Sequence, residues 1–133
     1  MSDFLNELAD YAVTQTGIGT VGTDVFVEEL PATPDNCQAI FGLPGTIIGD
    51  QREVASLAFP RVQLISRAES YETASDNMTA WRTALHNKYG IILPNFRIMR
   101  CHAEQEGGPI GQDDQGRFEF SINFIVEYNA ETA

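Results

Sequence analysis

Positive charge is scarce in this sequence of 133 residues, which has eight Lys and Arg residues against nineteen Asp and Glu residues. The formal net charge is −11 at pH 7. Proteins that bind nucleic acids or anionic membranes rely on cationic side chains that contact phosphates. The composition therefore argues against a protein that holds DNA or an anionic membrane surface. Acidity that serves solubility alone is an equally weighted alternative.

Cysteines and long apolar runs are scarce as well. Cys37 and Cys101 lie far apart and form no C-x-x-C motif, so we expect two small buried side chains and no disulfide framework. The first eleven residues, MSDFLNELADY, contain acidic residues where a secretory signal needs positive charge. No apolar run approaches the roughly 20 residues of a membrane-spanning helix. These absences predict a protein that stays in a cytoplasm-like compartment and has no membrane partner.

The sequence does contain enough apolar residues for a core. Hydrophobic residues make up 43% of the chain and aromatic residues 10%. A chain of this length is typical of one domain and buries roughly two-thirds of its unfolded surface. We therefore expect a single domain over residues 1–133.

Apolar spacings of three and four residues predict two helices. The first runs from a cap at Ser2 or Asp3 and ends at Gly17 and Gly19. The second begins after Ser70 and is expected to end before Gly90. Its predicted buried stripe consists of Tyr71, Ala74, Met78, Trp81, Leu85 and Tyr89.

Five segments are predicted to be strands, and the last of them has strict apolar alternation. A turn over 30–36 and loops over 44–59 and 107–116 separate some of these strands. The expected fold is α+β, with a mainly antiparallel sheet of about five strands and two helices packed on one face. The expected order is helix-strand-strand-strand-helix-strand-strand. The strands are predicted at 24–28, 37–43, 61–67, 96–103 and 117–128.

One G-x-G-x-x-G motif is present, at Gly17, Gly19 and Gly22. A dinucleotide-binding motif follows a strand and precedes a helix, so that the helix N-terminus meets the pyrophosphate. Here a helix is expected before the glycines and a strand after them. We interpret the motif as a helix stop and a loop.

The remaining candidates for chemistry are weak. Cys101 and His102 are neighbours on a predicted strand, so their side chains are expected to point to opposite faces. His86 lies near a helix end, where a partner for the helix dipole is the expected role. Asp113 and Asp114 are typical turn formers, with a weak divalent-cation site as the minor alternative. We therefore predict no catalytic, cofactor-binding or metal-binding residues and no enzyme activity.

Three stretches, taken in order, resemble the tail terminator proteins of long-tailed bacteriophages, a group also described as minor capsid or tail completion proteins. The first contains the turn LPATPDN between two short strands, and the second contains SYETA at the start of an amphipathic helix. The third is PIGQDDQGRFEFSINF, a loop that leads into the final strand. Together with the first helix they cover most of the chain, whereas residues 44–59 fall outside the resemblance.

This resemblance implies a subunit of a ring, usually sixfold, that caps the tail tube, stops its growth and docks to the head connector. It implies a virion location in the tail or neck after assembly in the host cytoplasm, and no cofactor. DNA would pass through such a ring without specific binding. Exposed acids are the candidates to line its bore: Glu28, Glu29, Asp113, Asp114 and Glu119.

Two other functions stay open at the level of sequence. A head-side connector or neck protein would also form rings. A small-molecule binding module would seat its ligand beneath the 44–59 loop. Mass in solution separates them, because a closed ring favours the assembly proteins and a monomer stabilised by ligand favours the binding module.

Overall fold

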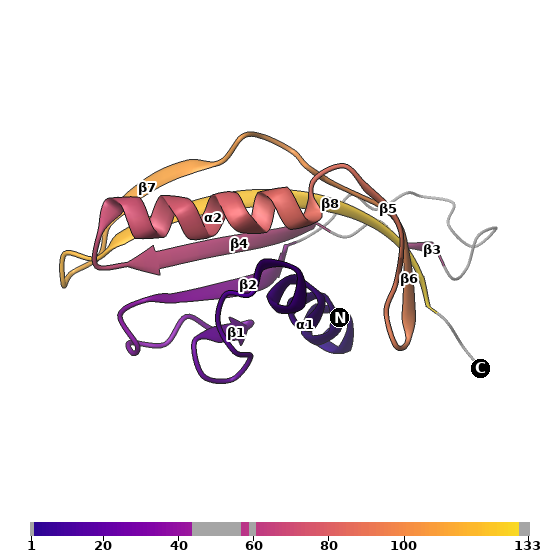
Figure 1. Cartoon of the computed structure of the whole chain (residues 1–133), viewed down its shortest axis with the longest axis horizontal. Coiled ribbons are helices and arrows are strands. Elements are labelled where there is room, and N and C mark those ends of the chain that lie inside the picture. Colours follow the sequence, from indigo (N-terminus) through magenta and orange to yellow (C-terminus); the bar gives the residue numbers. More distant parts are fainter. Residues whose placement is uncertain (1, 44–56, 59–60, 131–133) are drawn as a thin grey trace.

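The computed structural model describes residues 2–43, 57–58 and 61–130. Two helices lie on the same face of a curved sheet (Figure 1). Helix α1 (Ser2–Thr16) covers strands β1 (Val25–Val27) and β2 (Cys37–Leu43). Helix α2 (Tyr71–Leu85) covers β4 (Arg61–Ala68) and β8 (Phe118–Ala130). The α+β class and the placement of both helices agree with the sequence-based prediction.

The end of α1 is the one predicted from the sequence. The backbone N–H of Gly17 donates to the carbonyl of Val13 at 2.8 Å, and Gly17 has a φ of 69°. A residue without a side chain takes this left-handed conformation at little cost, which ends the helix. The helix begins at Ser2, so Ser2 and Asp3 both lie inside it and neither precedes it as a cap.

Helix α2 begins as predicted but ends earlier. The Ser70 hydroxyl accepts a hydrogen bond from the backbone N–H of Thr73 at 3.0 Å, as an N-cap does. The helix ends at Leu85, and Asn87 turns the chain with a φ of 60°. Tyr89 therefore belongs to a strand and is exposed, and Tyr71 at the other end is exposed too. The buried stripe is shorter than predicted and consists of Ala74, Met78, Trp81 and Leu85.

The described residues contain eight strands instead of five. The main path through the sheet is β1-β2-β4-β8-β6-β5, and β3 and β7 also pair with β8. Strands β1 and β2 are parallel, and the other pairs are antiparallel as predicted. Along the described residues the order is one helix, four strands, one helix and four strands. The remaining strands are β3 (Leu57–Ala58), β5 (Lys88–Ile92), β6 (Phe96–Ala103) and β7 (Gly108–Gln112).

The additional strands lie in segments that were expected to be loops or helix. Strand β3 falls in the 44–59 segment, the rest of which lies outside the described residues. Strand β7 falls in the 107–116 segment, where its glycines and proline favour a loop. It becomes a strand because it pairs with β8, with a register shift between Pro109 and Gly111. Tertiary pairing overrides local propensity at this site.

The core lies between the helices and the sheet. Alternate residues of the two central strands face the helices, among them Leu64 of β4 and Ile122 of β8, which are Cα partners. Trp81 of α2 is fully buried in the same layer. In the described part of the chain, no helix is long and apolar enough to span a bilayer.

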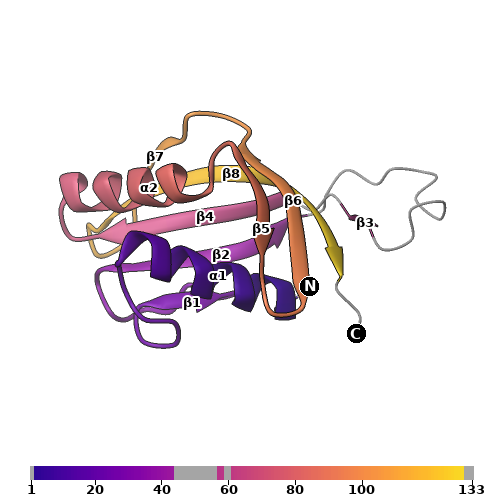
Figure 2. The same cartoon turned by 45° about the vertical axis from the view of Figure 1, so that its right-hand side comes forward.

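The β5–β6 hairpin crosses the direction of β2 and β4 at one end of the molecule (Figure 2). Its tip is attached to α1, because the Glu7 carboxylate accepts hydrogen bonds from the backbone N–H and the side-chain amide of Asn95, at 2.9 and 2.7 Å. The rings of Phe4, Phe96 and Tyr128 pack together beside this contact, with centroids 4.1 to 5.4 Å apart. The hairpin is therefore held in a defined orientation.

Candidate interaction surfaces

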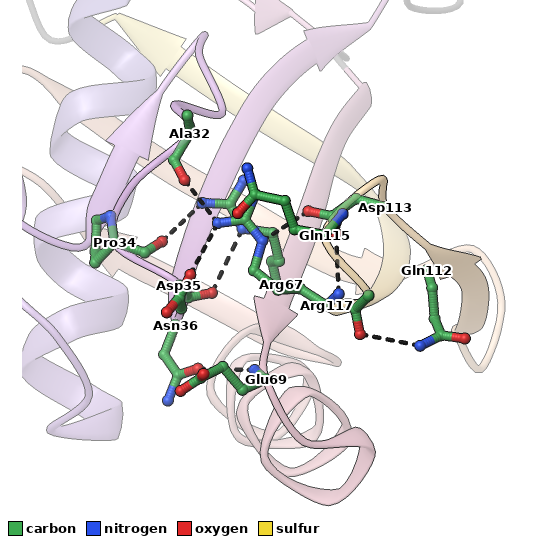
Figure 3. A network of polar contacts seen from close by, with 11 residues as sticks. Ala32, Pro34, Asp35, Asn36, Arg67, Glu69, Gln112, Asp113, Gln115 and Arg117 are labelled. Carbon is green, nitrogen blue, oxygen red and sulfur yellow. Dashed lines mark hydrogen bonds and ion pairs between the residues drawn. The ribbon is translucent and has the colours of Figure 1, made fainter.

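Two buried arginines hold the loop between β1 and β2 against the sheet (Figure 3). Arg117 donates to the carbonyl of Ala32 at 2.6 Å and to the Asp35 carboxylate at 3.2 Å. Arg67 donates to the carbonyls of Pro34 and Asp35 at 2.7 and 3.4 Å. A buried guanidinium is tolerated only where its N–H groups find acceptors. The loop carbonyls supply these acceptors, so the network fixes the shape of the loop.

Asp113 belongs to the same network. Its carboxylate accepts hydrogen bonds from the backbone N–H groups of Gln115 and Arg117 and from Arg117 Nε, the last at 2.7 Å. Desolvation by itself would raise the pKa of this carboxyl group, but the hydrogen bonds outweigh it and lower the pKa from its ordinary value. A carboxylate with these donors has little capacity left for a cation. The minor alternative of a divalent-cation site at Asp113 and Asp114 is therefore not supported.

An open hollow of about 670 Å³ lies beside the β1–β2 loop. Its wall includes Phe26, Pro31 and Pro34, which give it an apolar part. Among the residues that the structure describes, no Lys or Arg lines this hollow. We call it the acidic hollow, because its lining includes the acidic residues Asp24, Glu29, Asp35 and Glu69.

The outer face of the β5–β6 hairpin is the second distinctive surface. The inner face buries Ile91, Ile98 and Cys101 in the core. The outer face exposes apolar side chains, with Tyr89 64% and Ile92 72% accessible. We call this outer face the hairpin patch, and it consists of Tyr89, Ile92, Arg97, Met99 and Arg100.

Cysteine and histidine show no arrangement for nucleophilic chemistry. Cys101 is fully buried, and burial raises the pKa of its thiol to about 12, which leaves it protonated at neutral pH. His86 Nδ1 accepts a hydrogen bond from the backbone N–H of Ala103 at 2.9 Å. This bond joins the end of α2 to the β5–β6 hairpin. Groups of three or more His, Cys, Asp or Glu side chains that could hold a metal ion are absent from the described residues.

The glycine motif is a helix stop and a closed loop, as predicted. It follows α1, and the backbone N–H of Thr20 donates to the Asp24 carboxylate at 2.6 Å. A Cβ added at Gly19 would lie 2.6 Å from Val25 Cγ2, so this glycine is needed for close packing within the chain. The N–H group of Thr20 is therefore bonded within the loop, and the space beside Gly19 is filled by Val25.

Sequence reasoning did not find the two surfaces or the arginine network. The arginines are distant in sequence from the loop carbonyls that they contact, so no local pattern reveals them. The hairpin patch could have been found from the sequence, because residues 88–103 contain three cationic residues and no Asp or Glu in a strongly acidic chain.

These features define an α+β scaffold whose two distinctive exposed regions are the acidic hollow and the hairpin patch. Its sequence matches the profile of the bacteriophage tail terminator protein family over residues 12–130. The chain belongs to that family, which confirms the resemblance read from the sequence.

Solved structures show that the fold occurs elsewhere. A chain from the "Virion of native gene transfer agent (GTA) particle" has a TM-score of 0.60 and 14% sequence identity, with 94% of this chain and 96% of that chain covered. A second solved structure has a TM-score of 0.57 and the same identity, with coverages of 98% and 92%. No curated protein sequence matches the chain.

Proposed function

We propose that the chain is a virion structural protein that forms a ring, usually sixfold, at the head-proximal end of a phage tail. The ring caps the tail tube, stops its polymerisation and joins it to the head connector. Its partners are other copies of the chain, the tail tube protein and a head connector protein. Assembly takes place in the host cytoplasm, and DNA passes through the ring without specific binding.

The observation that carries this proposal is the family match, which extends from α1 to the end of β8. It thus includes the end of α1, all of α2 and the long central strand, rather than one short motif. The fold shared with a chain of a gene transfer agent virion is consistent with a role in a particle. Two surfaces of opposite charge on a rigid scaffold are features that an assembling subunit uses.

The absence of enzyme activity is part of the proposal. Cys101 is protonated in the core, Asp113 is bonded to Arg117, and the glycine loop is closed by Asp24. These three groups are thus engaged within the fold. We propose one domain with a purely structural role.

Two measurements test the proposal. Sedimentation of the purified chain should give the mass of a closed ring. Addition of that ring to polymerising tube protein from the same phage should cap the growing ends and stop elongation at substoichiometric amounts. Tubes that elongate equally with and without the ring contradict the capping function.

The same measurements separate the alternatives. A ring that binds the head connector but leaves tube growth unchanged favours a head-side neck protein. A monomer stabilised by a small molecule favours a binding module, for which the expected ligand site at 44–59 lies largely outside the described residues.

A further inference from the structure

Positive charge gathers on the β5–β6 hairpin. Residues 88–103 have a net charge of +3, so the rest of the chain carries −14 of the total of −11. Arg97 and Arg100 are both exposed on the outer face. In the described part of the chain, Arg100 makes no salt bridge. The hairpin is therefore a cationic segment of an otherwise acidic chain.

Apolar side chains lie among these charges. Tyr89, Ile92 and Met99 are exposed on the same hairpin, with Met99 42% accessible. Aromatic residues, Met and Arg are enriched at the centres of protein interfaces, where acidic residues are depleted. This composition is typical of a surface that another protein covers.

The acidic hollow lies at the opposite end of the molecule. The β1–β2 loop and the start of α2 lie at one end of the sheet, and the β5–β6 hairpin lies at the other, in both views (Figures 1 and 2). The hollow is concave, has an apolar part at Phe26 and Pro31, and presents acids such as Glu29 and Glu69. Neither of these two acids forms a salt bridge within the described residues. The hairpin patch and the hollow thus lie at opposite ends of the molecule and carry opposite charge.

We propose that the hairpin patch of one copy docks into the acidic hollow of the next copy. Because each copy has both surfaces at opposite ends, this contact is head-to-tail, and repetition of it closes a ring when the rotation per copy allows. The inference names the subunit contact of the proposed ring and therefore rests on the proposed function.

The charge distribution favours a second copy over nucleic acid as the occupant. A duplex that approached Arg97 and Arg100 would also meet a body with a net charge of −14, which repels phosphates. A second copy instead supplies carboxylates at the hollow and an apolar wall for Tyr89 and Ile92. Of these two occupants, the second copy matches both the cationic and the apolar side chains of the patch.

Charge reversal tests this contact in the full-length protein. Arg100→Glu, and separately the double variant Glu29→Lys/Glu69→Lys, should each raise the protein concentration at which rings form by about tenfold or more, as expected when a central interface charge is reversed. Mixing the two variants should restore rings that contain both chains, because opposite charges then meet at every contact. Mass photometry measures the assemblies, and circular dichroism verifies that each variant is folded.

The matched control is Asn6→Glu/Thr83→Glu, which adds the same −2 of charge as Arg100→Glu at exposed helix positions that belong to neither the hairpin patch nor the acidic hollow. It should form rings like the wild type. If the wild type and both reversal variants form rings at the same protein concentration, the hairpin–hollow contact is overturned and the proposed ring is not. A wild-type chain that stays monomeric contradicts the proposed ring itself. Duplex binding at physiological salt that Arg100→Glu abolishes would assign the patch to nucleic acid and also overturn the inference.

Discussion

At the scale of single residues, Trp81 is the largest fully buried side chain of the core. It lies on α2 and faces the sheet together with Met78 and Leu85. Truncation of a buried Trp removes many apolar contacts and leaves a cavity, at a typical cost of about 3–5 kcal/mol. We expect Trp81→Ala to lower the free energy of unfolding by about that amount, measured by urea denaturation.

Trp81→Phe is the informative control for this prediction. Trp81 Nε1 has no hydrogen-bond partner in the described part of the chain, so its replacement by Phe loses no hydrogen bond. The Phe variant should therefore lose clearly less stability than the Ala variant. Equal stability of Trp81→Ala and the wild type would contradict the core position of this side chain.

A second residue-scale prediction concerns Asp113 and pH. Hydrogen bonds from Arg117 and Gln115 lower the pKa of this carboxyl group in the folded state, so the unfolded chain binds its proton at higher pH. The stability that Asp113 contributes is complete above the ordinary Asp pKa of about 3.9 and is lost as pH falls through the lower folded value. Asp113→Asn should be less stable at neutral pH, and its deficit relative to the wild type should shrink on acidification.

Asp114→Asn is the control, because Asp114 is the exposed neighbour in the same turn. Urea denaturation at a series of pH values from neutral to strongly acidic measures both variants. A deficit of Asp113→Asn that stays constant over this range would show that the loss is steric and does not come from the charged hydrogen bonds.

At the scale of elements, Gly107 fixes how the chain passes from β6 to β7 across α2. Its φ is 85°, and an added Cβ would lie 2.9 Å from Met78 Sδ and 3.1 Å from the carbonyl oxygen of Ser121. Gly17 has a similar φ of 69° but open space around it. Both Ala variants incur the backbone strain of positive φ, whereas Gly107→Ala also overpacks the core, for which about 1–3 kcal/mol is typical.

The comparison of Gly107→Ala with Gly17→Ala therefore isolates packing from backbone strain. We expect Gly107→Ala to have the lower free energy of unfolding by about 1–3 kcal/mol, measured by urea denaturation of both variants. Equal losses in the two variants would mean that Met78 and its neighbours move aside without cost.

The elements that the sequence predicted well have local causes. Strand β2 was predicted with its observed limits, and α2 begins at the predicted cap because Ser70 bonds to Thr73 within one turn. The end of α2 was missed because Tyr89 continues the helical spacing, whereas the segment from Lys88 to Ile92 gains its hydrogen bonds from β6. Strand β7 was missed for the same reason, since its pairing partner follows a turn and its own residues disfavour strand.

The surfaces required the assembled fold. The acidic hollow combines residues of the β1–β2 segment with Glu69 at the start of α2, and no periodicity in the sequence relates them. Likewise Arg117 contacts Ala32, 85 positions away. A local pattern predicts helix and strand, but it does not reveal which loops meet at the end of a sheet.

At the scale of the whole molecule, the proposed ring has to accommodate a large negative charge. Six copies of a chain with net charge −11 carry −66 in total. The hairpin–hollow contact would neutralise part of this charge at the subunit boundaries, including Glu29. Among the acids expected in the bore, Glu28 accepts a hydrogen bond from the backbone N–H of Gly42, and Asp113 is bonded to Arg117. Asp114 and Glu119 are left as the main candidates for the bore.

The last prediction is that the assembled ring does not hold DNA. A negative bore offers no cations to neutralise phosphates, so duplex DNA slides through without a binding site. At physiological salt the repulsion is screened over about 8 Å and acts only next to the wall. Wild-type rings should therefore show no duplex binding by fluorescence anisotropy at physiological salt, whereas Asp114→Lys rings should gain binding that weakens steeply with added salt. Asp10→Lys, an exposed position on α1, is the control with the same change in charge. Tight duplex binding by the wild-type ring, or a bore lined by Lys and Arg in a map of the assembly, would contradict a negatively charged channel.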